Sequence, residues 1–303
     1  MWMKFAQDRR LVQMMYKTYH VAQSIEEALS LLLKSVDRKV RFIAGGTDLM
    51  LQLRERIVEA DMLVDISVIP EMKQISQDGS KISIGAVVSY SEMRQSDLLK
   101  KNGFLLVEAS KLIGATQIQN MGTIGGNIGN ASPAGDILPC LYALDAEIAL
   151  QSADKKRSMP LRRFITGYRQ LDLQPGELIS GISFEALQPG MGSSFVKFGA
   201  RQAQAISIVS VAAVLQVQAG KISRVAIALG SVAPTIVRSS SAEELLLSEQ
   251  PSPDLFEKAG EAARDDISPI DDIRGSAAFR RYITQPLVSQ ALETAWRRTQ
   301  KQI

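Results

Sequence analysis

The chain has 303 residues, of which 46% are hydrophobic and 22% are charged, so it is long enough for two or three globular domains. Its net charge of +3, from 35 basic and 32 acidic residues, is too small to indicate a nucleic-acid-binding protein. No apolar run approaches the roughly 20 residues that a membrane-spanning helix needs. The N-terminal sequence MWMKFAQDRRLVQMM has charges inside its apolar stretch and no signal-peptide cleavage site, so we expect a cytoplasmic protein.

Cysteine and histidine are scarce, and this excludes several kinds of site. The chain has one cysteine, Cys140, and one histidine, His20. By itself it cannot hold an iron–sulfur cluster, a cysteine zinc site or an internal disulfide. A Ser-His-Asp triad and a multi-histidine metal site are not expected either. If the protein takes part in catalysis, a bound cofactor would carry the chemistry.

The first predicted unit is a small α/β lobe over residues 13–70. Ser24 is placed to cap a helix over Ser24–Leu33, with Glu27 completing a capping box. Val40–Ala44 and Asp61–Ile66 have the composition of strands. Between them, residues 42–49 form a Gly-Gly turn that leads into a segment of helical periodicity.

A second lobe is predicted over residues 71–187. Residues 81–86 alternate at period two, as a strand does. Helices are expected over residues 89–94, 98–111 and 138–144, and a further strand over residues 145–151. Residues 188–193, Gln-Pro-Gly-Met-Gly-Ser, form the best linker candidate.

The rest of the chain, from residue 194, has a different pattern. Residues 206–218 and 222–229 are rich in β-branched residues and flank Ala-Gly-Lys, which indicates a hairpin. Helices are expected over residues 241–246 and 254–263 and in a long tail over 275–282 and 286–298. We predict a three-stranded antiparallel sheet that carries these helices.

Two glycine-rich blocks are the strongest functional signals. Residues 122–127, Gly-Thr-Ile-Gly-Gly-Asn, are followed closely by Asn130, Ser132 and Asp136. Glycine lets a backbone approach a ligand, and exposed N–H groups in such a turn bind anions. The upstream Gly45-Gly46 turn leads into a possible helix, which is also a potential phosphate site. Neither block is a GxGxxG fingerprint or a Walker motif, and a single Gly-Gly turn often serves geometry alone.

Together these two blocks resemble segments of a known protein family. AGGTDLM at 44–50 and MGTIGGNIGNASPAGDILP at 121–139 resemble the flavin subunit of molybdenum hydroxylases, such as xanthine, carbon monoxide and nicotinate dehydrogenases. SFVKFGARQAQAIS at 194–207, LGSVAPTIVR at 229–238 and IRGSAAFRR at 273–281 are similar to the C-terminal part of that family. The resemblance covers nearly the whole chain in order.

The resemblance implies an α+β fold with a two-lobed FAD-binding domain of the p-cresol methylhydroxylase type over residues 13–187. A C-terminal domain like that of the carbon monoxide dehydrogenase flavoprotein would follow over residues 194–300. Substrate would be hydroxylated in a large molybdopterin subunit, and electrons would pass through a [2Fe–2S] subunit to this FAD. The acceptor would then be NAD, oxygen or a quinone, although no NAD-specific motif is visible.

The resemblance also implies a set of FAD-binding residues. The diphosphate would lie between Phe42, Ile43, Ala44, Gly45, Gly46, Thr47, Asp48 and Leu49 on one side and Thr123, Ile124, Gly125, Gly126 and Asn127 on the other. Ile113, Gly114 and Asn120 would lie near the flavin, with Ile113 where some relatives place an aromatic residue. Ser132 and Asp136 would bind ribityl or adenosine hydroxyls, and Ile179 and Lys197 would complete the pocket.

Other interpretations stay open at this point. Asp136 can instead cap a helix that begins at Ile137, and Lys197 can be a surface lysine. His20 and Cys140 are poorly placed to link a flavin, so we expect non-covalent FAD, with Cys140 as a buried small hydrophobe. The alternatives to an electron-transfer subunit are a stand-alone flavin oxidoreductase of the same fold and a non-catalytic FAD-binding protein.

Overall fold

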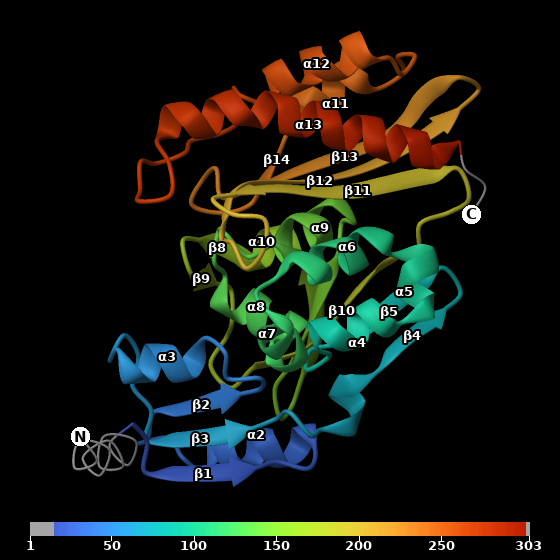
Figure 1. Ribbon diagram of the computed structural model, residues 1–303. Helices are drawn as coiled ribbons and strands as arrows, with labels where there is room; N and C mark the ends of the chain where they lie inside the picture. The colour runs from blue at the N-terminus through green and yellow to red at the C-terminus, as the bar shows by residue number, and fades with distance from the viewer. Residues whose placement is uncertain (1–14, 301–303) are drawn as a thin grey trace.

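A computed structural model describes residues 15–300 of the chain. The predicted domain start at residue 13 and most of the N-terminal sequence MWMKFAQDRRLVQMM therefore lie outside the described residues. The chain forms three units, each built on its own sheet and stacked in chain order (Figure 1). Within residues 15–300, no helix combines the length and apolar character that a membrane crossing requires.

The first unit is a parallel three-stranded sheet of order β1-β3-β2, flanked by two helices. Ser24 caps the first helix as predicted, accepting a hydrogen bond from the Glu27 amide at 3.1 Å. The Glu27 carboxylate reaches one residue further back than a capping box requires and accepts from the Gln23 amide. The elements are β1 (Thr18–Val21), α2 (Ile25–Leu33), β2 (Val40–Ile43), α3 (Leu49–Arg54) and β3 (Met62–Asp65).

The second unit is a five-stranded sheet of order β4-β5-β10-β6-β7, with antiparallel pairing throughout, covered by helices. The strands are β4 (Ile75–Asp78), β5 (Lys81–Gly85), β6 (Glu147–Gln151), β7 (Lys156–Pro160) and β10 (Leu178–Glu185). The helical elements are η2 (Pro70–Lys73), α4 (Tyr90–Gln95), α5 (Asp97–Asn102), α6 (Phe104–Leu112), α7 (Thr116–Met121), α8 (Ile124–Asn130), α9 (Ile137–Ala143) and α10 (Leu161–Phe164). A separate small hairpin joins β8 (Ile165–Gly167) to β9 (Gln170–Leu171).

One helix predicted in this unit is in fact two. The segment 98–111 breaks at Gly103, which has an extended φ of −152° and separates α5 from α6. A Cβ at this position would lie 3.2 Å from the ring of Phe184, so the break lets the chain pass close to β10. The helical periodicity continues across the break, and the sequence therefore did not reveal it.

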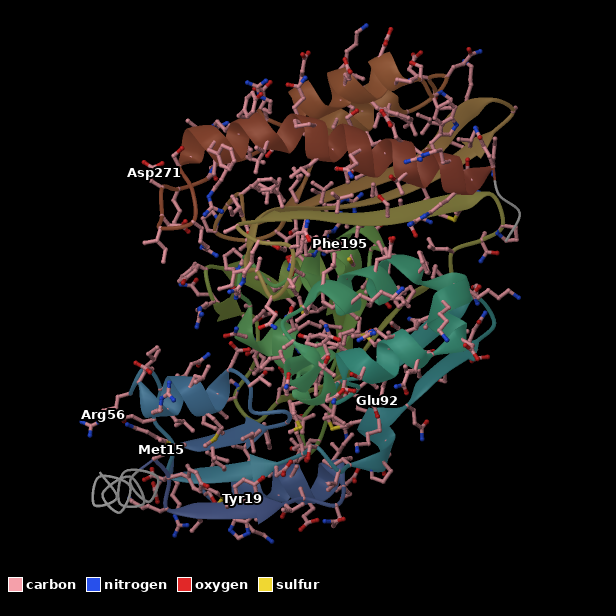
Figure 2. All side chains as sticks on the ribbon, in the orientation of Figure 1. Met15, Tyr19, Arg56, Glu92, Phe195 and Asp271 are labelled. Atoms are coloured by element: carbon pink, nitrogen blue, oxygen red, sulfur yellow. The ribbon has the colours of Figure 1, made fainter. Side chains whose placement is uncertain are left out.

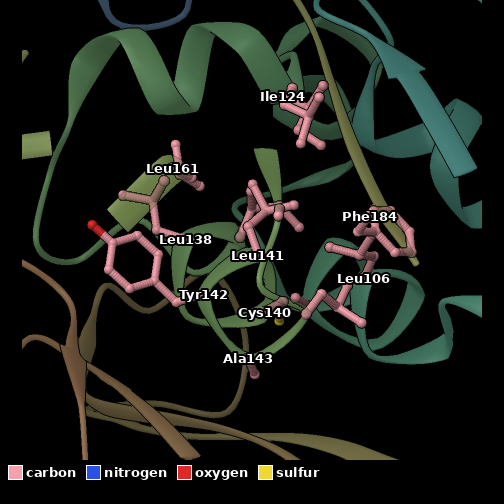
Figure 3. Packing of buried hydrophobic residues seen from close by; sticks show 14 of the residues in the cluster. Leu106, Ile124, Leu138, Cys140, Leu141, Tyr142, Ala143, Leu161 and Phe184 are labelled. Carbon is pink, nitrogen blue, oxygen red and sulfur yellow. The ribbon is translucent and has the colours of Figure 1, made fainter. Parts of the chain in front are cut away.

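The main core lies between the second sheet and its helices and continues into the third unit. Every residue of α9 is buried, including Cys140, Leu141 and Tyr142 (Figure 3). Cys140 is thus the buried small hydrophobe that the sequence predicted. Phe195 of the next unit belongs to the same cluster and lies where β11 faces α6 (Figure 2).

The third unit has a four-stranded antiparallel sheet of order β11-β12-β13-β14, where we predicted three strands. The extra strand is only two residues long, too short to leave an alternating pattern. The predicted linker 188–193 also runs into the sheet, because β11 begins at Met191. The elements are β11 (Met191–Gly199), β12 (Ser207–Gln218), β13 (Lys221–Gly230), β14 (Val237–Arg238), α11 (Ser240–Leu246), α12 (Pro253–Ala262) and α13 (Ala277–Thr299).

Helix α13 packs on the third sheet at a position where only glycine fits. A Cβ on Gly192 of β11 would lie 1.9 Å from the carbonyl oxygen of Ala295. One turn away, the Ser194 hydroxyl donates to the Ala291 carbonyl at 2.7 Å. The helix and the strand are therefore in direct backbone contact.

We expect Gly192→Ala to lower the free energy of unfolding by about 1–3 kcal/mol or more, because backbone cannot move aside as a side chain can. Urea unfolding followed by circular dichroism measures this change. Gly129→Ala is the control, since a Cβ there meets only the Ile179 side chain at an ordinary contact distance of 3.7 Å and the backbone is not in the left-handed region. A Gly192→Ala protein as stable as the wild type would contradict the contact.

Candidate functional site

A cavity of about 630 Å³ lies between the first and second units. Small-molecule sites commonly have volumes of roughly 300–1,000 Å³. Its walls are the turn from β2 to α3, the open face of α8 and the segment from Arg169 to Ile179. All eight residues from Phe42 to Leu49 line it. From the downstream glycine block Thr123, Gly125, Gly126 and Asn127 also line it, so the structure brings the two blocks together.

The two glycine blocks touch each other through backbone atoms. A Cβ on Gly45 would lie 1.6 Å from the carbonyl oxygen of Met121, a separation that no real side chain allows. Gly46, beside it, has a φ of +67°, which favours glycine. Gly45 is therefore required for contact between the units and Gly46 for the shape of the turn.

The downstream glycines divide into packed and open positions. A Cβ on Gly125 would meet the Cβ and carbonyl oxygen of Ala86 at 2.6 Å, and one on Gly122 would meet the Tyr90 ring at 2.7 Å. Gly126 differs, because a Cβ there would meet only the Thr123 hydroxyl, at 2.9 Å. Gly129 also faces the cavity, and a Cβ added there would lie 3.7 Å from the Ile179 side chain. The cavity thus has a bare backbone wall at Gly126 and Gly129.

Backbone donors are distributed unequally between the blocks. In α8 the amide of Ile124 donates to Val88, that of Gly125 to Ala86, and that of Gly126 to the Thr123 hydroxyl, at 2.8–3.0 Å. In contrast, within residues 15–300 no protein acceptor receives a hydrogen bond from the amides of Gly45, Gly46, Thr47 and Asp48. The free anion-binding donors therefore lie in the β2–α3 turn, whereas we had expected both blocks to supply them.

Asn127 presents a further unsatisfied group in the cavity wall. Its amide nitrogen donates to the Tyr90 hydroxyl at 3.0 Å, while its buried amide oxygen has no partner in the described chain. Burial raises the pKa of Tyr90, so its phenol stays neutral at physiological pH. Because the unpaired Asn127 oxygen is fully buried and lies beside Gly135, it is not open to a ligand in the cavity.

Seven of the predicted residues do not line this cavity. Ile124 is fully buried in the core. The Asn120 side-chain oxygen accepts a hydrogen bond from Ser91, and the Ser132 hydroxyl accepts one from the Ala134 amide. Ile113 accepts a hydrogen bond from Gln119, and Gly114 packs against Ile118, both within the second unit. Asp136 and Lys197 lie at the boundary between the second and third units.

Asp136 and Lys197 form a buried ion pair across that boundary. The Lys197 ammonium lies 2.7 Å from the Asp136 carboxylate and also donates to the carbonyls of Leu112 and Ala205, both at 2.9 Å. Ser207 donates to the other carboxylate oxygen. Burial raises the pKa of Asp136, and the contacts with Lys197 and Ser207 oppose this shift. Lys197 is therefore not a surface residue, and the Asp136 side chain makes no helix-capping hydrogen bond.

The structure also adds cavity residues that sequence reasoning missed. Gln52 of α3 donates to Asn130 of α8 at 3.0 Å and links the two units beside the cavity. Arg169, Leu171, Leu173 and Gln174 form a wall that has no glycine motif or periodicity to reveal it. The Asn130 side chain was the one detectable signal, since it lies in the same polar block.

The described part of the chain has no cluster of side chains that suits a metal ion, and neither its histidine nor its cysteine lines the cavity. Within residues 15–300, no three histidine, cysteine or acidic side chains lie close enough to hold a metal ion. His20 is exposed on β1, and Cys140 is buried in the core. The cavity combines free backbone donors, apolar walls and bare glycine surface, which suits a large ligand with an anionic centre.

Comparison with known proteins agrees with this arrangement. Residues 13–184 match a family described as the FAD binding domain in molybdopterin dehydrogenase, and residues 194–295 match the carbon monoxide dehydrogenase flavoprotein C-terminal domain. The chain is 30% identical to the carbon monoxide dehydrogenase medium chain of Hydrogenophaga pseudoflava, over 92% of this chain and 97% of that one. It is 32% identical to the 6-hydroxypseudooxynicotine dehydrogenase complex subunit alpha of Paenarthrobacter nicotinovorans, over 92% and 94%.

A solved structure of carbon monoxide dehydrogenase from Hydrogenophaga pseudoflava superimposes with a TM-score of 0.88 at 31% identity, covering 93% of this chain and 97% of that one. The chain therefore belongs to the family of FAD-binding subunits of molybdopterin dehydrogenases and is a subunit of an oxidoreductase.

Proposed function

We propose that this chain holds FAD non-covalently in the cavity between its first two units and transfers electrons from [2Fe–2S] clusters in a partner subunit to an acceptor. The observation that carries the proposal is the row of free amides from Gly45 to Asp48 in a cavity whose opposite wall is bare at Gly126. A diphosphate needs such donors and needs backbone unobstructed by side chains.

The residues present fit FAD in three respects. The four amides of residues 45–48 would hold the diphosphate, and the bare backbone at Gly126 and Gly129 would let the ligand approach α8. The apolar side chains of Leu171 and Ile179 would cover ring surface. Ser132, Asp136 and Lys197, which the family resemblance implicates, lie outside this wall. For Asp136 and Lys197 we propose a supporting role, holding the third unit against the second.

The remaining assignments also rest on the resemblance. We propose that the first two units are the lobes of a p-cresol methylhydroxylase-type domain over residues 13–187, and that residues 194–300 form the C-terminal domain. Ile113 and Gly114 follow Leu112, whose carbonyl accepts a hydrogen bond from Lys197, and we propose that they lie toward the flavin end. We also propose that the protein is cytoplasmic.

Electron transfer is favoured over direct oxidation of a substrate. FAD, when bound, can take up electrons singly and release them in pairs. The described residues that line the cavity include no histidine, and Tyr90 is held neutral. Of the two carboxylates in the wall, Glu177 is paired with Arg157, which leaves Asp48 as the one unpaired carboxylate among these residues. A single cysteine in the chain means that any [2Fe–2S] cluster must come from a partner.

The proposed complex contains a [2Fe–2S] subunit and a large molybdopterin subunit, with NAD as one candidate acceptor. Its support is the family membership together with relatives that are named medium chains and FAD-binding subunits. A stand-alone flavin oxidoreductase and a non-catalytic FAD-binding protein are the alternatives.

Gly126→Val should weaken FAD binding roughly 100-fold or more while the protein stays folded. The valine would fill the space beside the α8 backbone, and its Cβ would disturb only the Thr123 cap. Flavin absorbance of the purified variant and a titration with FAD measure the loss. Gln117→Val, on the exposed face of α7 and outside the cavity wall, is the control. Full flavin content in a folded Gly126→Val protein would refute the site.

Acid precipitation of the FAD-loaded protein should release all the yellow colour into the supernatant. Neither His20 nor Cys140 lies in the cavity wall, so no histidine or cysteine can form the covalent link there. Absorbance of supernatant and pellet gives the result. Flavin that stays on the pellet would show that the attachment is covalent.

The isolated chain, loaded with FAD, should not be reduced by aldehydes or N-heterocycles under anaerobic conditions. Addition of the cluster and molybdopterin subunits should restore substrate-dependent bleaching of the visible flavin absorbance. Reduction by substrate without any partner would favour the stand-alone oxidoreductase instead.

A further inference from the structure

The β8–β9 hairpin places an arginine at the cavity in an unusual backbone conformation. Tyr168 and Arg169 form the two-residue turn of this hairpin, which lies on the same side of the molecule as α3 (Figure 1). Arg169 has a φ of +53°, in the left-handed region that favours glycine and asparagine. A side chain kept at such a position commonly has a use that offsets the strain.

Arg169 also carries a charge that the protein does not neutralise. Two cationic residues line the cavity, Arg41 and Arg169. Arg41 donates to the carbonyl of Glu59, whereas in residues 15–300 the Arg169 guanidinium makes no hydrogen bond or ion pair and lies 5.9 Å from the Tyr168 ring centroid. The cavity wall also contains Asp48 and Glu177. Arg169 is exposed to solvent in the free protein, so its charge is available to a dianionic diphosphate bound in the cavity.

A separate ion-pair network fixes the wall that carries the hairpin. Arg157 of β7 binds the Glu177 carboxylate with two nitrogens, at 2.7 and 2.8 Å, and also bonds to Asp172. Hydrogen bonds from Arg157 lower the pKa of Glu177, so this carboxylate stays ionised and paired. The Asp172 amide donates to the Phe164 carbonyl at 2.8 Å and closes the base of the hairpin. The network neutralises Glu177 and fixes the base of the hairpin, whose tip carries Arg169.

We propose that Arg169 binds the diphosphate of the dinucleotide from the side opposite the amides of residues 45–48. The β8–β9 hairpin is then a fixed clamp, and the guanidinium supplies the charge that the glycine turn lacks. This inference rests on the proposed FAD site and adds to it a binding residue that comes from neither glycine block.

The test compares Arg169→Gln, Arg169→Lys and Arg169→Gly with the wild-type chain. Arg169→Gln should weaken the binding of FAD and of ADP roughly 10- to 100-fold and leave riboflavin binding unchanged, because riboflavin has no phosphate. The dependence of FAD affinity on salt should also become shallower. Arg169→Lys should recover part of the affinity.

Arg169→Gly separates binding from folding. Glycine accepts the left-handed backbone, so this variant should melt at the same temperature as the wild type or higher, yet bind FAD as weakly as Arg169→Gln. Arg163→Gln, on the exposed side of α10 and outside the cavity wall, is the matched control for loss of one charge and should bind FAD normally.

Wild-type affinity for FAD and ADP in Arg169→Gln would overturn the inference while leaving the FAD site intact. An equal loss of FAD affinity in Arg163→Gln would overturn it as well. So would a loss of FAD affinity in Arg41→Gln with none in Arg169→Gln. A wild-type chain that binds no FAD would overturn the proposed function together with this inference.

Discussion

The contact between Gly45 and the carbonyl of Met121 is the constraint on which the site depends. It joins the first unit to the second through backbone atoms alone, so any side chain at residue 45 would push the units apart. With the turn fixed in this way, the amides of residues 45–48 make no hydrogen bond to protein in the described chain and lie in the cavity wall. Gly125, packed on Ala86, holds α8 at the matching distance and leaves Gly126 bare on the other side. The close packing of Gly45 and Gly125 on neighbouring backbone thus determines the space that is left for a ligand.

A second set of polar contacts joins the third unit to the second. Lys197 and Asp136 are both buried, and their pairing is favourable only because two carbonyls and a serine hydroxyl satisfy the remaining donors and acceptors. On the far side of α6, Arg298 of α13 forms a bidentate ion pair with Glu108 at 2.7 Å and lies over the Phe104 ring. The shared hydrophobic core between these pairs completes the interface. Asp136 and Lys197, which the family resemblance implicates in cofactor binding, thus form part of the contact between the second and third units.

The sequence predicted which segments line the cavity better than it predicted which of their groups are free to bind a ligand. Glycine and short polar residues identified both walls, since only such residues allow close approach. Which amides are free could not be predicted, because Ala86 and Val88, distant in sequence, accept the hydrogen bonds of α8. Arg169 escaped notice because a charged residue in a hairpin turn has no motif, and its φ appears only in the structure. Likewise, Gly103 interrupts a helical pattern without changing its periodicity, and β14 is too short to show one.

Hydrogen exchange of individual amides, measured with and without FAD, tests the central claim most directly. Without FAD, the amides of residues 45–48 should exchange rapidly, and those of Ile124 and Gly125 should already be protected by Val88 and Ala86. With FAD, the amides of Gly45, Gly46, Thr47 and Asp48 should become strongly protected, while those of α8 should change little. Unchanged exchange at residues 45–48, with new protection confined to α8, would contradict the account.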